Sequence, residues 1–381
     1  MKKTNVLFLI VCFCCLICVV VKAEQTTEEY TQEVLTQQIE KLPFYDVDRQ
    51  IEQIWQKTEI PSFKDCVMNA ITEGKLIDFE YLFSIFVQKL AGEITTQISM
   101  IKKILFIVLL SAILKNVNTS FQLKSVGELG FYVCYMVLIV VITATFYSQT
   151  DMVNNTIKSI ETFFKAMMPV FMTLSIASEG YGQATVTAPA IMAGAAILTN
   201  IVCYGILPAI VMVTSLEMIN NISEKPMLNR FTKLFQGVIS WGMKGIAFLF
   251  MALLSLQKLG GSLLNQGIGK TAKAVVTSVP IVGDVMGGAV DTAAALTEMI
   301  RGGTLIATVV FLALLCAVPL IRLAIMILIY KIMAAVSEPI CESRLVKCIS
   351  GAGDFSVLLF GALFLVECMF LFSAILLLTF F

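Results

Sequence analysis

Two aspartates stand in the stretch of this 381-residue chain where residue types and spacing best support chemistry. Asp284 and Asp291 are seven residues apart, so on a helix they share one face. Two carboxyl groups can form an aspartyl dyad, but such a dyad takes one acid from each of two segments, whereas these two are neighbours in one. The chain has no histidine, which excludes zincin motifs and Ser-His or Cys-His pairs. We therefore expect no enzyme.

A nearby glycine-rich string also fails as a cofactor site. Gly267-Ile-Gly-Lys-Thr271 looks like the end of a phosphate-binding loop, but that pattern requires a glycine where Leu264 stands. Cys341 and Cys348 have neither a second cysteine pair nor a histidine with which to build a zinc site. Neither a cofactor nor a metal is expected.

Both aspartates belong to a Gly/Asp-rich segment, residues 259–303, which is too apolar for a solvent loop and too interrupted for a membrane span. Gly283 and Gly287 are four residues apart, a spacing that lets helix backbones approach closely. One interpretation is a re-entrant or amphipathic hairpin whose aspartates face water, a pore or a partner, because irregular backbone at membrane depth needs such cover. The other is a surface helix pair with capping and solvated acids. The residues alone leave both open.

The elements that must position this segment belong to a membrane protein. The chain is 58% hydrophobic and 14% charged, with 27 basic and 27 acidic residues and a mean hydropathy of +0.87. Soluble domains are less apolar and more charged, and disordered chains are far less apolar, so both classes are excluded. Continuous apolar runs such as Leu129 to Tyr147 do not alternate as barrel strands do. The fold class is therefore all-α and polytopic.

The amino-terminal part differs from the rest. Residues 1–23 have the anatomy of a secretory signal peptide, with Lys2 and Lys3 before an apolar run that ends near Ala23; the alternative is an uncleaved first transmembrane helix. Either way, the following residues should lie outside the cytoplasm. Residues 24–100 carry 14 acidic and 6 basic residues with apolar positions at helical spacing, which predicts a small acidic helical domain. Cys66 is its one thiol.

The remaining residues, 101–381, form a multi-span membrane domain of six to eight helices. The expected span that follows Tyr147 is short and contains Pro169. The number of spans therefore depends on whether such short segments cross the membrane. Lysines and arginines in the connections favour the cytoplasm for the loops near Lys124, Lys225 and Arg344. The expected spans are 101–117, 129–148, 163–178, 184–203, 205–222, 238–257, 304–329 and 355–380.

Two cations fall inside these spans. Lys244 comes early in the sixth and Arg322 late in the seventh, each within about two turns of the end assigned to the cytoplasm. Long cationic side chains can reach the interface from such depths. The alternative is a buried carboxylate partner, for which Glu217 and Glu367 are the candidates.

The sequence resembles the stage III sporulation protein AE family of endospore-forming bacteria. The resemblance covers almost the whole chain, with Met168-Pro169, Leu207-Pro208 and Glu217 at positions where the family has similar features. Its most distinctive stretch runs from Pro280 to Thr292, and the matching residues are Pro280, Gly283, Asp284, Gly288, Asp291 and Thr292.

The resemblance implies a membrane component of the secretion-like channel complex that links mother cell and forespore during sporulation. The protein would lie in the mother-cell membrane, the outer forespore membrane, with its amino-terminal domain outside the cytoplasm. Its partners would be the lipid bilayer and other stage III sporulation membrane proteins, with no nucleic acid. The alternative is a stand-alone secondary transporter, whose broken helices would be marked by Pro169, Pro208, Pro280 and Pro319. No convincing repeat between halves supports it.

Overall fold

The structure is a computed structural model of the full chain. It describes residues 38–40, 42–55, 62–72, 92, 97–114, 124–179, 181–223, 227–276 and 283–379. The predicted signal peptide, residues 1–23, lies outside these ranges, as does most of the stretch between 73 and 96.

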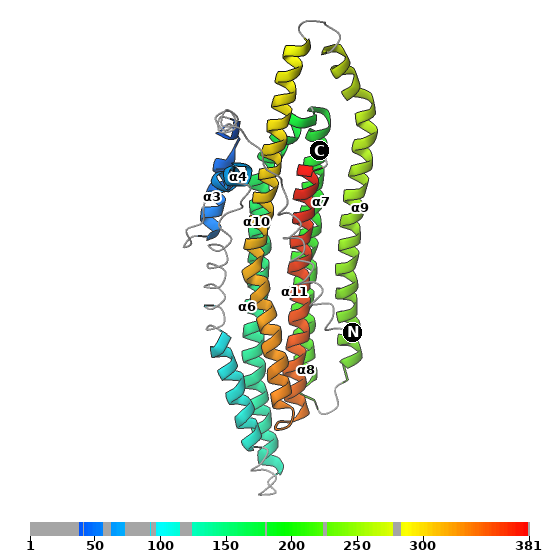
Figure 1. Ribbon diagram of the computed structural model, residues 1–381. Helices are drawn as coiled ribbons and strands as arrows, with labels where there is room; N and C mark the ends of the chain where they lie inside the picture. Colours follow the sequence, from blue (N-terminus) through cyan, green and yellow to red (C-terminus); the bar gives the residue numbers. More distant parts are fainter. Residues whose placement is uncertain are drawn as a thin grey trace.

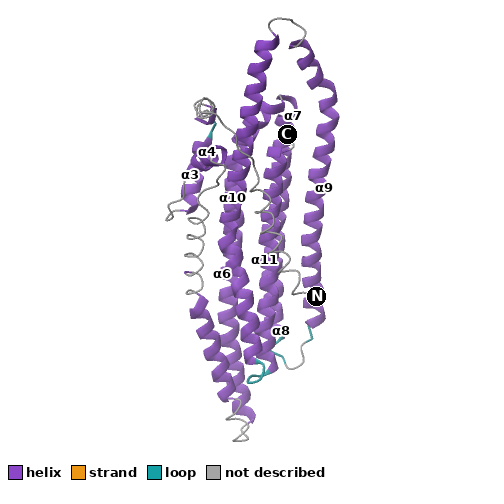
Figure 2. Cartoon of the chain, in the orientation of Figure 1, coloured by secondary structure: helices purple, strands orange, loops and turns teal. Residues whose placement is uncertain are grey.

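Every regular element in the described part of the chain is a helix (Figure 2), as the all-α prediction requires. Two short helices precede a set of long ones, and one five-residue π-helix interrupts the series. The elements are α3 (Phe44–Trp55), α4 (Phe63–Thr72), the helix Gln97–Leu114, α6 (Lys124–Glu179), α7 (Tyr181–Ile201), η1 (Val202–Ile206), α8 (Leu207–Asn220), α9 (Asn229–Val276), α10 (Gly283–Ser337) and α11 (Ser343–Thr379).

The long helices form an elongated bundle (Figure 1). α11 lies at its centre against α6 and α10, while α9 runs along the outside. Among the described residues, six stretches are long and apolar enough to cross a membrane, which confirms the prediction of an all-α polytopic membrane protein. They are Gln97–Leu114, Leu129–Ile176, Ala188–Asn220, Asn229–Leu256, Ala295–Ser337 and Ser343–Thr379.

The expected break between the second and third spans is absent, because α6 continues through residues 149–162 and through Pro169. At 1.5 Å per residue its 56 residues extend about 84 Å, against a hydrocarbon core of about 30 Å. Between Leu129 and Ile176, the large apolar side chains exposed on α6 all lie from Leu129 to Tyr147. Beyond that point the exposed positions of α6 up to Ile176 are Ser148, Asp151, Asn155, Lys158, Thr162, Lys165, Pro169 and Thr173.

The predicted third span, 163–178, is therefore apolar for a different reason. Phe163, Phe164, Phe171 and Leu174 are buried in the protein core, and they do not face lipid. A hydropathy window cannot separate a helix that faces lipid from one whose apolar side faces its own bundle. The correction is that residues 163–178 do not form a separate span but are the later part of one continuous helix, α6.

No loop separates the expected fourth and fifth spans either. The π-helix η1 joins α7 to α8, and Pro208 occupies the first turn of α8. Proline has no backbone N–H, so the widened turn accommodates a missing hydrogen bond without ending the helical path. Ala188–Asn220 is consequently a single long apolar stretch.

The connections that carry basic residues lie at one end of the bundle. In Figure 1 the lower end contains the start of α6, the passage from α8 to α9 and the turn from α10 to α11. Arg230, Lys233 and Arg344 lie at these positions. We call it the basic end. The upper end contains the start of α7 and the neighbouring ends of α9 and α10.

The two short helices do not form a core of their own. Phe44, Val47, Phe63 and Val67 belong to the same buried cluster as the inner residues of α6, α10 and α11. Helices of 12 and 10 residues have one apolar face each and need a larger surface to bury it against. They lie beside α6 and α10, in the upper half of the view in Figure 1.

Candidate functional site

The Gly/Asp-rich segment occupies the facing ends of α9 and α10. Pro280 lies outside the described residues, and α10 begins at Gly283. Its first three turns contain the other predicted site residues, so their backbone is helical and Asp284 and Asp291 share a helix face. They lie at the end opposite the basic end (Figure 1). Their role in assembly stays a prediction. The residues in these turns are Gly283, Asp284, Gly287, Gly288, Asp291 and Thr292.

At the basic end, Arg344 connects three parts of the chain. Its guanidinium donates to Glu342 Oε2 from Nη2 at 2.9 Å and to the carbonyl of Ile222 from Nη1 at 3.2 Å. The same group lies 4.1 Å from the ring centroid of Phe131 on α6. One planar cation thus holds the turn before α11, the end of α8 and the start of α6 together.

A second group of charges lies just above Arg344. Lys331 Nζ is 3.0 Å from Asp354 Oδ1 and donates to the carbonyl of Ser350 at 3.2 Å, which ties α10 to α11. Glu217 on α8 is close to Gly351, where an added Cβ would stand 3.2 Å from Glu217 Oε1. A glycine at 351 therefore leaves room for the acidic side chain between α8 and α11.

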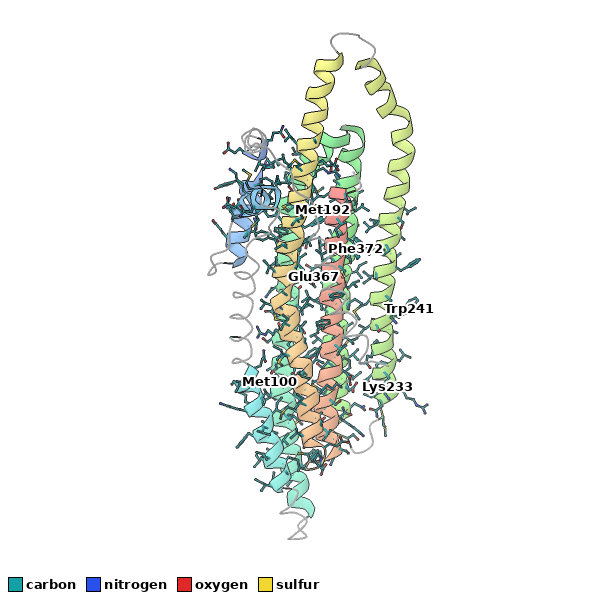
Figure 3. All side chains as sticks on the ribbon, in the orientation of Figure 1. Met100, Met192, Lys233, Trp241, Glu367 and Phe372 are labelled. Carbon is teal, nitrogen blue, oxygen red and sulfur yellow. The ribbon has the colours of Figure 1, made fainter. Side chains whose placement is uncertain are left out.

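Glu367 is the most enclosed acidic residue of the described spans. Only 1% of its surface is exposed, and no ion pair joins it to a cation among the described residues. Figure 3 shows it in the interior of the bundle on α11, and the Cys316 thiol on α10 interacts with it electrostatically. Glu367 is therefore not the hydrogen-bonded partner proposed for the membrane cations.

The two intramembrane cations have different surroundings. Arg322 is partly buried in α10 and is partnered. Lys244 is exposed on α9, and no ion pair joins it to another described residue. Because α9 begins at Asn229, well before the expected start at 238, Lys244 lies in the middle of the apolar stretch Asn229–Leu256. Its expected position close to the cytoplasmic end of a span stays a prediction.

The helix α4 docks on α10 at a glycine pair. An added Cβ at Gly303 would stand 2.6 Å from Ile71 Cγ1 and 3.1 Å from the backbone oxygen of Val67, so only glycine permits this approach. The ring of Phe63 lies 5.4 Å from that of Phe311 on α10 and 6.3 Å from that of Phe163 on α6. We call this contact the α4 dock.

Asp48 fixes the start of α4. Its Oδ1 accepts a hydrogen bond from the Phe63 N–H at 2.6 Å and its Oδ2 accepts one from Ser62 Oγ at 3.0 Å, which satisfies an unpaired donor of the first turn. Burial raises the pKa of the Asp48 carboxyl, and these two hydrogen bonds oppose that effect. Burial likewise raises the pKa of the Cys66 thiol to about 12. Cys66 is therefore a protonated core residue at neutral pH.

Sequence reasoning missed three long-range contacts of this kind. Gly302 and Gly303 were visible as a glycine pair, but the helix that docks on Gly303 is more than 200 residues away in the chain. Arg301 Nη2 donates at 2.9 Å to the carbonyl of Leu378, near the end of α11. Arg344 carried no signal beyond its positive charge. In the part of the chain that the structure describes, no group of three or more His, Cys, Asp or Glu comes together as a metal site.

The fold and the positions of the charges define an all-α polytopic membrane protein with amino-terminal helices docked on two of its long helices. The family model described as stage III sporulation protein AE matches residues 61–380, a range that contains α4 and all six apolar stretches. The chain belongs to this sporulation protein family.

One relative supports the same assignment. The chain is 22% identical over 306 residues to the stage III sporulation protein AE of Bacillus subtilis (strain 168). The matched region covers 79% of this chain and 74% of that protein. No solved structure matches the chain.

Proposed function

We propose that this protein is a membrane component of the sporulation-specific channel complex that connects the mother cell with the forespore. The observation that carries the proposal is the family match, because it includes the α4 dock as well as the six apolar stretches. A sporulation protein in which amino-terminal helices are held rigidly against a bundle longer than a bilayer is suited to join a membrane to a layer beside it.

In this proposal the protein lies in the mother-cell membrane, the outer forespore membrane, with its basic end in the cytoplasm. Basic residues at the connections near Arg230 and Arg344 favour that side under the positive-inside rule. The α4 dock then lies beyond the lipid region on the extracytoplasmic side, in line with an exported amino-terminal domain. The partners are other stage III sporulation membrane proteins of the same complex.

The protein serves as a platform and not as an enzyme. The α4 dock and the Arg344 contacts fix the two ends of one bundle, which favours a rigid scaffold. The alternative function is a stand-alone transporter, but its main support, the expected broken helices, is weakened. Both α6 and α10 continue as helices through Pro169 and Pro319, so two of the expected discontinuities are absent.

The test is crosslinking and copurification from sporulating cells with a tagged copy of the full chain. The wild type is compared with a variant that carries Asp284→Asn and Asp291→Asn, and with Glu298→Gln as the matched control, since Glu298 is an exposed acid on the same helix. We expect the wild type and the control to recover several sporulation membrane proteins. Loss of these proteins in the double variant would make the start of α10 an assembly surface.

Two results would contradict the proposal. The first is that the wild type recovers no sporulation membrane protein. The second is that the purified chain alone, in liposomes, takes up a solute, since a scaffold should be inert without its partners. Equal recovery by all variants, combined with blocked spore development in the double variant, would instead move the aspartates from assembly to conduction.

A further inference from the structure

A buried polar contact joins three of the long helices. Gln149 on α6, Tyr330 on α10 and Ser356 on α11 are buried, with 4%, 0% and 0% of their surfaces exposed. The Ser356 hydroxyl donates to Gln149 Oε1 at 3.1 Å. The Tyr330 hydroxyl interacts with the same glutamine side chain. We call this group the Gln149 contact.

The surroundings of the Gln149 contact are apolar and closely packed. Val153 and Leu359, each about one turn from a member of the contact, are fully buried. An added Cβ at Gly353 would stand 3.1 Å from Tyr330 Cβ, so α10 and α11 approach closely here. A polar group in such surroundings must find a hydrogen-bond partner, because burial without one is costly. The Gln149 amide therefore restricts which part of α11 can lie beside it.

Other axial positions of α6 would separate Gln149 from Ser356. Long helices that touch through apolar side chains can shift past one another by one turn, about 5.4 Å, and still bury apolar surface. A single buried polar residue can select one register among such alternatives. The residues of α11 one turn and one heptad from Ser356 have no polar side chain to offer the amide. They are Ala352, Phe360, Ile349 and Leu363.

The register of α6 also determines whether the α4 dock can form. The ring of Phe63 packs on Phe163 of α6 and on Phe311 of α10 at the same time. The rings of Phe163 and Phe311 are stacked on each other, with centroids 6.3 Å apart. Phe163 follows Gln149 by about 21 Å on the same continuous helix. A one-turn shift of α6 would separate Phe163 from Phe311 and divide the surface that receives Phe63.

We infer that the Gln149 contact sets the axial register of α6 against α10 and α11, and that this register controls the α4 dock. In the native register the amino-terminal helices are held against the bundle. In a shifted register they are released. The device is built from residues of this chain alone, so it operates whatever the partners of the protein are.

The first experiment measures the register in the purified full chain. Amino acids that carry spin labels replace Lys158 on α6 and Lys347 on α11, which are both exposed, and pulsed electron paramagnetic resonance gives the distance between them. The otherwise unchanged chain should give one distance. With Gln149→Leu, a tenth or more of the molecules should show a second distance, displaced by about one helical turn. Ser356→Ala removes the same hydrogen bond with a smaller change of volume and should show the same second distance.

The second experiment follows the α4 dock through alkylation of Cys66, which is buried beneath it. Gln149→Leu should raise the alkylation rate roughly tenfold, because the dock is open in the shifted molecules. Its melting temperature should not fall, since an apolar residue of similar volume replaces a buried amide. Asn155→Leu is the matched control. Asn155 is exposed on the same helix and hydrogen-bonds Asp151 at the surface, so this variant should match the wild type in distance and rate.

Three outcomes would overturn the inference. The first is one unchanged distance in both Gln149→Leu and Ser356→Ala. The second is a shifted distance with an unchanged rate of Cys66 alkylation, which would separate the register from the dock. The third is faster alkylation without a second distance, which would mean that the dock opens by another route. The proposed function is tested separately, by copurification, and survives each of these outcomes.

Discussion

The helices α9 and α11 each contain a stretch long and apolar enough to cross a membrane, but their surroundings are opposite. In the most apolar window of α11, 67% of the positions are buried inside the protein, against 22% for α9. The buried side of α11 meets α6, α8 and α10, whereas α9 touches the bundle along one narrow side. Apolar sequence therefore has two distinct roles here: in α11 it forms the core, and in α9 most of it stays exposed on the outside of the bundle.

The charges follow the same division. Glu367 on α11 is enclosed by the core, and Lys244 on α9 is exposed. A buried carboxylate is enclosed by its own protein, while an exposed ammonium group depends on what surrounds the protein. Substitutions in α11 and in α9 should therefore have different effects, and measuring them tests this division.

The largest effect is expected in the core. Phe370→Ala on α11 removes a side chain that is 1% exposed and whose ring centroid lies 5.0 Å from that of Phe164. The free energy of unfolding should fall by about 3–5 kcal/mol, while Phe248→Ala on α9 should change it by about 0.5 kcal/mol or less. Denaturant unfolding of the two purified variants in the same detergent measures both. Equal losses would contradict the division between core and outer helix.

The second prediction concerns the α4 dock. Gly303→Leu forces a side chain into Ile71 and Val67 and should open the dock at a cost of about 1–3 kcal/mol, whereas Gly302→Leu places the same side chain in open space. Alkylation of Cys66, followed on its own peptide by mass spectrometry, is the measurement, because this buried thiol with a pKa of about 12 reacts only after opening. We expect roughly a tenfold faster reaction in Gly303→Leu alone. A similar rate in both variants would mean that α4 does not dock there.

The third prediction concerns the basic end. Arg344→Ala removes the contacts to Glu342, the Ile222 carbonyl and the Phe131 ring, and should lower the free energy of unfolding by about 1–3 kcal/mol. Lys347→Ala, an exposed change on the same helix, should have an effect near zero. Thermal unfolding of the two variants is the measurement. Matching melting temperatures would show that the guanidinium does not join the three segments.

The smallest effect is expected at Glu367. Glu367→Gln keeps the shape and removes the capacity for charge, so the free energy of unfolding should change by about 1 kcal/mol or less, in the stabilising direction. Thermal unfolding tests stability, and spore formation tests function. A variant that is as stable as the wild type but blocks spore formation would give the carboxylate a chemical role beyond packing.

Much of the fold could be predicted because the bilayer restricts the choice of structure. Continuous apolar runs exclude barrels, and the helical spacing of Ile51 and Ile54 correctly indicated α3. Span boundaries were less predictable, since Phe163 and Phe171 are as apolar in a protein core as they would be in lipid. Pro169 and Pro319 also proved compatible with continuous long helices.

The candidate site was predictable only in part. The sequence located Lys244 and Glu367 inside spans, but their surroundings depend on which side of each helix faces the bundle. The contacts of Arg344 and Gly303 join segments far apart in the chain, and no local pattern announces such a contact. The amino-terminal prediction for residues 1–23 and the positions of the Asp284 and Asp291 side chains stay predictions.

The α4 dock also sets an order of events during synthesis. Phe63 is translated long before Phe311, the aromatic partner on α10 that it contacts in the finished bundle. Until α10 is inserted, only α6 can cover the apolar faces of α3 and α4, and the contact of α4 with α10, which is of such long range, forms late. The emerging amino-terminal segment therefore needs protection against aggregation while most of the chain is still being made. Its rigid attachment is among the final steps of maturation.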